Sequence, residues 1–352
     1  MELGSEFNLR LEELEETQNS IYYKLKKHHT YYLDSGRSAL KLLLKEIKKG
    51  EVLLPEYICD SVIRAFSEFN INYYRLKEDL TIDLDDFHSR VNDNTRVVYV
   101  MHYFGALQPE EILTQIFLMK NQSDFIIIED TTHSLFSRMQ TIGDYCICSL
   151  RKWFAIPDGG ILYSTKPLEF CNMNDLKRNT NIDKAYGMIL KNLYLDGKIE
   201  SNLLYRKILT DAEKKIDENK KIMKISSFSE YLLKCHDTIH LTTRRKENYT
   251  QLLNEIATIG LKPIVKVEEG LCPFVLPISI DGRDTLREYL IENKVYCAVH
   301  WPLEITSLYK IKRSRKLSER ILSLPIDQRY GLEEMSYLIR VLKNYKEIKK
   351  CR

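Results

Sequence analysis

The stretch "SLRKWFAIPDGG", which begins at Ser149, contains the residue types most suited to covalent chemistry. Ser149 offers a hydroxyl that can bind phosphate, and Lys152 offers an amine that can form a Schiff base. An amine becomes a usable nucleophile when desolvation or nearby positive charge favours its neutral form. Arg151, Trp153 and Phe154 supply both influences, so we predict that Lys152 enters a covered site.

Two other interpretations of this stretch stay open. The spacing Ser-x-x-Lys also occurs in penicillin-binding serine enzymes, but their Ser-Asp-Asn and Lys-Thr-Gly companions are absent from the sequence. A lysine on the surface without a partner is the other alternative.

A second segment, "DSGRSAL", predicts the start of a helix at small residues. The free N–H groups and the positive dipole end of a helix form an anion site, here around Ser35, Gly36 and Arg37. A plain helix N-cap by Ser35 is the simpler interpretation. No GxGxxG motif follows a predicted strand, and no Walker lysine is present.

A third segment, "IIIEDTTHS", ends an apolar run with Glu129 and Asp130, and His133 follows three residues later. A carboxylate at the end of a central strand is costly to bury unless a cation or a donor meets it. The protonated nitrogen of a pyridine ring is one such cation. A metal-ligand pair and an aspartate that caps the next turn are the alternatives.

The elements that would position these residues alternate between strands and helices, which predicts an α/β fold with a mostly parallel sheet flanked by helices. Ligands gather at the carboxyl ends of the strands in such a sheet. All three segments lie at predicted strand ends or helix starts, and together they fit pyridoxal phosphate. The predicted strands are 51–55, 71–76, 96–105, 124–130, 144–150 and 159–164.

The later part of the chain has a different pattern. A lysine-rich, helix-prone stretch from about 166 to 234 is typical of a solvated helix surface, and we assign it no function. Beyond it, a helix at 244–259, strands at 273–280 and 295–302 and helices at 283–294 and 332–345 predict a compact α+β unit. We therefore expect an N-terminal segment (1–30), a large cofactor-binding domain (31–234) and a smaller C-terminal α+β domain (235–352).

Composition limits the partners and the compartment. The 352 residues include 53 lysines and arginines against 50 aspartates and glutamates, a net charge of +3, so nothing calls for nucleic acid or an acidic membrane. The eight cysteines are scattered, which predicts reduced thiols and no metal site. The N-terminus lacks an apolar signal core, so we expect a cytoplasmic protein. Its "GSEF" is either native or an expression scar.

Motifs along most of the chain resemble the fold type I pyridoxal phosphate enzymes, in particular the DegT/StrS-type sugar aminotransferases. "LDSGRSALKLLL" is similar to Ser-Gly-Thr-x-Ala-Leu, "GEVLLPEYICDSV" to Gly-Asp-Glu-Val-Ile-x-Pro, and "IIIEDTTHSLFS" to Val-Ile-Glu-Asp-Ala-Ala-His/Gln. "DNTRVVYVMHYFGALQP" resembles the strand Thr-Lys-Ala-Ile-x-x-Val-His-x-x-Gly, and "KWFAIPDGGILYS" the lysine segment that ends in Glu-Gly-Gly. "RRKENY", "YLIENKVYCAVHWP" and "SERILSLPID" resemble signatures of the small domain.

The resemblance implies a role for each matching residue. Lys152 would carry the cofactor, Asp130 would pair with the pyridine nitrogen, and His133 would lie against the ring or its 3-oxygen. Ser149, with the backbone of Gly36 and Arg37 next to Ser35, would hold the phosphate.

Three departures from the family pattern concern the cofactor and the acceptor. Arg37 replaces the usual Thr or Ser and could contact the phosphate directly. The position that often stacks an aromatic on the ring is Cys59, which leaves Tyr57 as a candidate for stacking. The Gly-x-Asn-x-Arg-Met segment of the acceptor site has no clear counterpart between residues 166 and 234.

The resemblance implies transamination from an amino acid, glutamate by family likeness, to a keto-sugar that is nucleotide-linked, in cell-surface polysaccharide or secondary metabolite biosynthesis. It also implies a homodimer with the site at the subunit interface. The alternatives are a pyridoxal phosphate-dependent sugar dehydratase, whose relatives usually carry histidine in place of Lys152, a non-catalytic binding protein of this fold, and a nucleotide-binding α/β protein. Candidate wall residues of the acceptor site are Tyr103, Arg151, His300 and Trp301.

Overall fold

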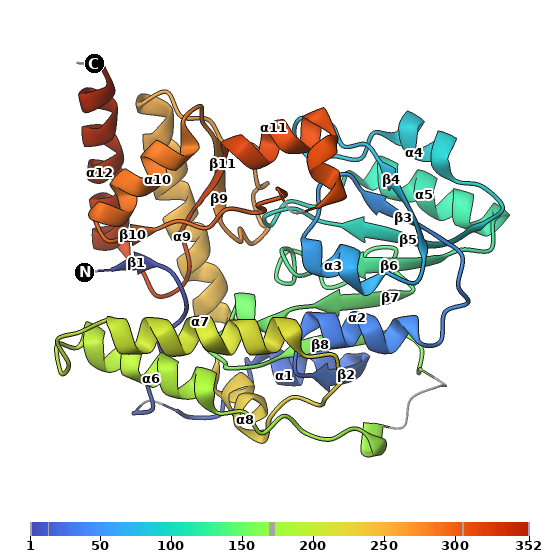
Figure 1. Cartoon of the computed structure of the whole chain (residues 1–352), viewed down its shortest axis with the longest axis horizontal. Coiled ribbons are helices and arrows are strands. Elements are labelled where there is room, and N and C mark those ends of the chain that lie inside the picture. Colours follow the sequence, from blue (N-terminus) through green and yellow to red (C-terminus); the bar gives the residue numbers. More distant parts are fainter. Residues whose placement is uncertain (1, 13, 169–172, 305, 351–352) are drawn as a thin grey trace.

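The computed structural model describes residues 2–12, 14–168, 173–304 and 306–350 (Figure 1). Cys171 and Cys351 lie outside these residues. In the described part of the chain, no helix combines the length and the apolar character needed to cross a membrane. The six cysteines within it are free thiols.

A seven-stranded sheet with the order β2-β8-β7-β6-β5-β3-β4 forms the centre of the larger part of the molecule. The four pairings from β4 to β7 are parallel, and β8 pairs antiparallel with both β7 and β2. The predicted α/β class with a mostly parallel sheet is therefore confirmed. The strands are β2 (His29–Leu33), β3 (Glu51–Pro55), β4 (Asn70–Tyr74), β5 (Thr95–Met101), β6 (Ile126–Asp130), β7 (Tyr145–Cys148) and β8 (Gly160–Ser164).

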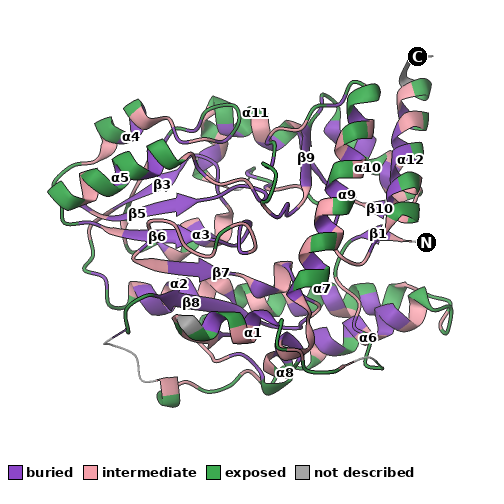
Figure 2. Ribbon diagram, turned by 180° about the vertical axis from the view of Figure 1, so that it is seen from behind, coloured by how far each residue is buried: buried purple, intermediate pink, exposed green. Residues whose placement is uncertain are grey.

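Helices cover this sheet, and its central strands are almost entirely buried (Figure 2). Val- and Ile-rich runs that are buried on both faces are typical of parallel strands between helical layers. The helices that connect the strands are α2 (Gly36–Leu44), α3 (Asp60–Ala65), α4 (Leu84–Arg90) and α5 (Glu110–Gln122).

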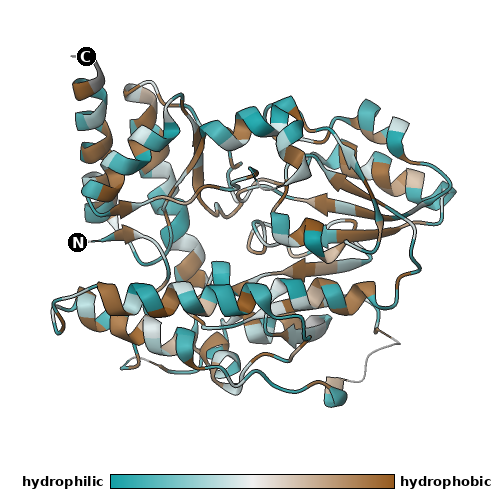
Figure 3. Cartoon of the chain, in the orientation of Figure 1, coloured by the Kyte–Doolittle hydropathy of each residue, from teal (hydrophilic) through white to brown (hydrophobic). Residues whose placement is uncertain are grey.

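Two helices follow β8 and pack on each other as a hairpin, α6 (Asp183–Leu195) and α7 (Leu203–Glu218). Apolar and polar residues alternate along α7 in the manner of an amphipathic helix (Figure 3). Its buried residues are Tyr205, Leu209 and Ala212. Helix α8 (Ser227–Cys235) comes next and leads to the C-terminal part.

The C-terminal part has a hydrophobic cluster of its own, formed almost entirely by residues 249–345. Strands β9 and β11 pair antiparallel within it. Strand β1 (Leu3–Gly4) pairs with β10, so the N-terminal segment packs on this part, with Leu3 fully buried. Its elements are α9 (Thr238–Thr258), β9 (Leu276–Ser279), α10 (Arg283–Glu292), β10 (Val295–Tyr296), α11 (Lys312–Arg320), β11 (Ile321–Leu324) and α12 (Leu332–Lys350).

The strand expected at 295–302 is shorter than predicted, because only Val295–Tyr296 forms a strand. Beyond it, Ala298 forms a single bridge to Ser323 of β11, and a side chain holds the backbone that follows. The Tyr57 hydroxyl donates to the His300 carbonyl and accepts from the Trp301 N–H at 2.9 Å. Pro302 then lacks the N–H that a ladder would need.

One glycine fixes the contact between β8 and the start of α2. A Cβ atom on Gly160 would lie 2.1 Å from the Ser35 carbonyl carbon and 2.3 Å from the Gly36 nitrogen. Both of these are backbone atoms, which cannot rotate away. The absence of a side chain at Gly160 therefore lets α2 begin where it does.

We expect Gly160→Ala to push α2 off the sheet edge and to lower the free energy of unfolding by more than about 2 kcal/mol, because overpacking against backbone is not relieved by a change of rotamer. Gly331→Ala is the matched control, since its Cβ would have no neighbour closer than 3.7 Å. Chemical denaturation of the two variants measures the difference. Equal stabilities would contradict this account of the close approach.

Candidate functional site

A cavity of about 390 Å³ opens beside the carboxyl ends of the parallel strands. It brings together most of the residues predicted from the sequence, from four separate elements. The predicted residues that line it are Ser35, Gly36, Arg37, Cys59, Asp130, Ser149 and Lys152, together with the candidate wall residues Arg151 and Trp301, and they are joined by Tyr99, Met101 and Thr132.

The start of α2 forms one wall of this cavity. The Ser35 hydroxyl accepts from the Ser38 N–H at 3.1 Å, so the N-cap interpretation is correct for Ser35. A Cβ on Gly36 would lie 3.2 Å from the Ser149 Cβ, which shows how closely this helix end approaches Ser149. The first N–H groups of a helix have no partner within it. This wall therefore has the chemistry of an anion cradle.

Asp130 lines the same cavity and is a buried carboxylate at the end of β6. Its Oδ1 accepts from the Thr132 N–H at 2.8 Å and its Oδ2 from the Tyr99 hydroxyl at 2.7 Å. Burial, followed by the Asp130 charge, raises the pKa of Tyr99 well above its usual value, so Tyr99 stays a donor. Each carboxylate oxygen can accept a further hydrogen bond from a cationic N–H.

Tyr99 was not predicted from the sequence. The pairing of β5 with β6 shows why it lies near Asp130. Met101 is paired with Asp130 across the two strands, and both line the cavity. Tyr99 precedes Met101 by two residues, so it faces the same side of the sheet.

Lys152 lines the cavity, and its Nζ lies 3.5 Å from the Nε2 atom of His133. The imidazole of His133 is fully buried and is stacked on Phe274 and Trp301, at 4.4 and 5.4 Å between ring centroids. It does not border the cavity itself. The structure therefore places His133 against the lysine rather than in the cavity wall.

Helix α7 supplies counter-charges that sequence reasoning missed. The Arg37 guanidinium binds the Asp217 carboxylate at 2.7 Å, and Arg151 and Lys184 both bind Glu213. Burial raises the pKa of Glu213, but Arg151 and Lys184 outweigh it and lower that pKa to about 2. The interpretation of residues 166–234 as a merely solvated surface is thus wrong for α7.

Both arginines keep a buried donor for a ligand. The Nε atoms of Arg37 and Arg151 are buried and have no hydrogen-bond partner among the described residues. Buried polar groups are normally satisfied. Because both side chains line the same cavity, the two unsatisfied donors indicate that an anion completes the site.

Tyr57 does not reach this cavity. Its ring is buried behind the wall, where its hydroxyl bonds to the backbone of His300 and Trp301. Trp301 is the aromatic side chain that lines the cavity in its place. Tyr103, another candidate wall residue, is buried and donates to the Tyr57 carbonyl at 2.6 Å, so it serves packing.

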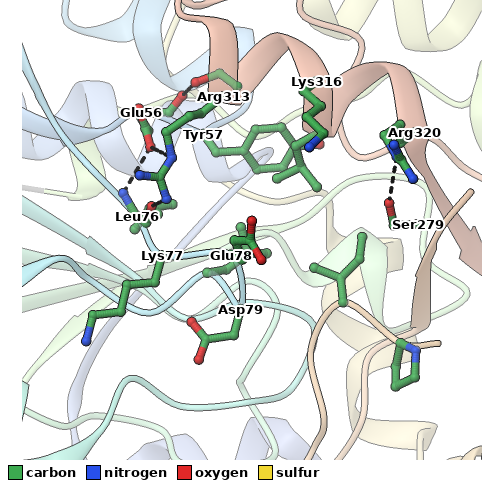
Figure 4. Close-up of a pocket in the computed structure, with 15 residues that line it drawn as sticks. Glu56, Tyr57, Leu76, Lys77, Glu78, Asp79, Ser279, Arg313, Lys316 and Arg320 are labelled. Atoms are coloured by element: carbon green, nitrogen blue, oxygen red, sulfur yellow. Dashed lines mark hydrogen bonds and ion pairs between the residues drawn. The ribbon is translucent and has the colours of Figure 1, made fainter.

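A larger cavity of about 500 Å³ lies on the other side of Tyr57, between α11 and the segment 76–80 (Figure 4). Its buried carboxylate, Glu56, accepts from the Leu76 N–H at 3.1 Å and lies 3.7 Å from Arg313. Cations and carboxylates are mixed around it, and neither Asp130 nor Lys152 lines it. Its size alone does not make it the reactive site.

No protein-family model matches the chain, and no curated protein matches its sequence. Solved structures do match. A candidate sugar aminotransferase, Spr1654 of Streptococcus pneumoniae in its PLP form, is 15% identical with a TM-score of 0.66, over 96% of this chain and 93% of that one. DesV of S. venezuelae is 17% identical with a TM-score of 0.62, over 90% and 85%. NtdA of Bacillus subtilis with bound PMP is 15% identical with a TM-score of 0.63, over 92% and 74%.

These likenesses extend over nearly the whole chain, so both its sheet domain and its C-terminal part have the fold of these aminotransferase structures. The fold predicted from the sequence motifs is therefore confirmed. At identities of 15–17%, the match concerns the fold alone.

The histidines at the site make stability depend on pH. Burial, followed by the Lys152 charge, lowers the pKa of His133 far below its usual value and that of His300 to about 3. An unfolded histidine titrates near 6.5. Below about pH 6.5 the unfolded chain therefore binds protons that the folded chain does not, and stability is lost as the pH falls toward 3.

We expect the free energy of unfolding to fall with decreasing pH between pH 6 and pH 4 in the wild type, and to fall less steeply in His300→Gln. The two slopes should differ by about 1.4 kcal/mol per pH unit, the contribution of one histidine. His88→Gln, which changes an exposed histidine, should keep the wild-type slope. Urea denaturation across this pH range measures the slopes. An unchanged slope in His300→Gln would show that His300 is protonated in the folded protein.

Proposed function

We propose that this protein is a pyridoxal phosphate-dependent aminotransferase that moves an amino group from an amino acid, glutamate, to a nucleotide-linked keto-sugar. The observation that carries the proposal is the single cavity that Asp130, Lys152 and the start of α2 line together. The fold supports it, since Spr1654 and NtdA have been solved in PLP or PMP forms. By resemblance, the product would serve cell-surface polysaccharide or secondary metabolite biosynthesis.

The described residues fit pyridoxal phosphate. The cavity of about 390 Å³ is within the range of small-molecule sites. A Cβ on Gly36 would lie only 3.2 Å from the Ser149 Cβ, so glycine keeps this helix start uncrowded, and the unsatisfied Nε atoms of Arg37 and Arg151 suit a phosphate. Asp130 offers a carboxylate to a protonated ring nitrogen, and Lys152 offers an amine to the aldehyde carbon.

Each residue would then have a defined task. When bound, pyridoxal phosphate supplies an electron sink that stabilises negative charge at the carbon bearing the substrate amine. Asp130, oriented by Tyr99 and Thr132, favours positive charge on the ring nitrogen. Lys152 would hold the cofactor covalently, and its free amine would move the proton at that carbon. Neutral His133 lies against Lys152 without adding a second charge.

We expect Lys152→Ala to abolish the yellow absorbance of the protein with pyridoxal phosphate, and to lower turnover of glutamate by more than about 100-fold, because it removes both the covalent anchor and the proton carrier. Borohydride reduction followed by peptide mass spectrometry should locate the cofactor on residue 152 of the wild type. Lys166→Ala, at an exposed lysine, is the control. A reduced cofactor on another lysine, or full turnover in Lys152→Ala, would refute the proposal.

We also propose a cytoplasmic homodimer. Apolar side chains stand exposed at both ends of the α6–α7 hairpin, with Ile182 at 72% and Leu203 at 73% exposure, and such surfaces favour association. The free thiols of the described part suit a reducing compartment. Sedimentation velocity on protein from the soluble cell fraction should give about twice the chain mass of 41.6 kDa. A monomer at micromolar concentration would contradict the dimer.

A further inference from the structure

A second cavity, of about 490 Å³, meets the first one at Arg151 and Lys152, which line both. It extends on the side of the C-terminal part of the chain. Its walls come from segments far apart in the sequence: the N-terminal residues 4–7, residues 274–275 before β9, Arg287 on α10, and residues 323–329 at and after the end of β11. Lys152 therefore borders two cavities whose walls come from different parts of the chain.

The charges around the second cavity are unequal. Five cationic side chains line it, Arg151, Lys152, Arg245, Arg287 and Arg329, against two carboxylates, Glu6 and Asp327. Arg329 is neutralised by both oxygens of Asp327, at 2.7 and 2.9 Å. Glu6 is bound by Lys184 at 3.0 Å, outside the cavity. Arg151 is paired with Glu213, so Lys152, Arg245 and Arg287 are the cations that keep the cavity positive.

Arg245 is the most unusual of these cations. It is 1% exposed, and no carboxylate of the described residues lies within ion-pair distance of it. Its Nη1 donates to the Phe274 carbonyl at 2.7 Å and its Nε to the Gln328 side chain at 2.9 Å, while the Trp153 ring lies 4.5 Å from its Cζ. These contacts hold the guanidinium in place. The charge of Asp327, which is bound to Arg329, also acts on Arg245, but burial outweighs it and lowers the pKa of Arg245. A buried charge left in this state is costly unless an anion binds near it.

Arg287 has hydrogen-bond donors that no described residue engages. It lies exposed on α10, and its Nε donates to the Cys297 carbonyl at 3.3 Å. Its two terminal nitrogens have no partner among the residues that the structure describes. A guanidinium with a free planar end binds carboxylates and phosphates with two parallel hydrogen bonds.

We infer that the second cavity binds the oxyanion group of the compound that exchanges its amine at Lys152, with Arg287 as a specificity-determining contact and Arg245 as a fixed charge in the same wall. The ligand group is a carboxylate of the amino donor or a phosphate of the nucleotide-linked acceptor. The inference rests on the proposed function, because it assumes that the reacting carbon meets Lys152. The cavity then gives the charged part of each substrate a place away from the cofactor.

The test is calorimetric titration of the full-length protein, with and without pyridoxal phosphate, using glutarate as the carboxylate probe and uridine diphosphate as the phosphate probe. Neither compound carries an amine or a keto group, so neither can react. Arg287→Gln should weaken the binding of at least one probe by tenfold or more, while the affinity for pyridoxal phosphate stays that of the wild type. Arg340→Gln, at an exposed arginine of α12, is the matched control.

Each outcome decides the inference. A loss of glutarate binding alone assigns the cavity to the amino donor, a loss of uridine diphosphate binding alone assigns it to the acceptor, and a loss of both assigns it to a shared subsite. Wild-type affinity of Arg287→Gln for both probes, or no binding of either probe to the wild type, would overturn it. A protein that binds a probe but no pyridoxal phosphate would refute the proposed function and leave the anion site standing.

Discussion

The concentration of positive charge around one cavity is the constraint on which the arrangement of the site depends. Arg37, Arg151 and Lys152 all line it, and like charges in a partly desolvated space repel strongly. Helix α7 relieves this by bringing Asp217 to Arg37 and Glu213 to Arg151. Among the described residues, no carboxylate pairs with Lys152. The lysine is thus the one cation of the three that no ion pair restrains, as a reacting amine requires.

Local patterns were sufficient to predict six of the seven strands of the sheet, β3 to β8, and the residues at their ends. Strands β5 and β6 are apolar runs buried on both faces, and each run ends where polar residues begin, so the position of Asp130 follows from the sequence alone. Strand β2 was missed because its exposed and half-buried residues lack a clear period, and only its antiparallel pairing with β8 makes it a strand. The short β11, Ile321–Leu324, likewise depends on its partner β9.

The contributions of distant segments could not be predicted in this way. A carboxylate that neutralises a buried arginine looks the same in the sequence as one that faces water, so the acids of α7 were indistinguishable from a solvated helix face. Trp301 was only a candidate for the wall, because it follows Lys152 by about 150 residues and the packing of the C-terminal part against the sheet brings it to the cavity. The opposite case is Tyr57. It is only two residues from Cys59, which lines the cavity, yet its own buried ring does not reach that cavity.

The N-terminal residues Ser5 to Phe7 are held by side chains from distant parts of the chain. Lys191, buried on α6, donates to the Ser5 hydroxyl at 2.7 Å and to the Glu6 carbonyl at 2.6 Å. Arg329 donates to the backbone carbonyls of Ser5 and Glu6. The Phe7 ring lies 4.4 Å from the Arg329 Cζ. A buried lysine is costly unless its donors are satisfied. Without this segment Lys191 would lose the acceptors at Ser5 and Glu6. The same contacts fix the place of residues 4–7 in the wall of the second cavity, which Lys152 also lines.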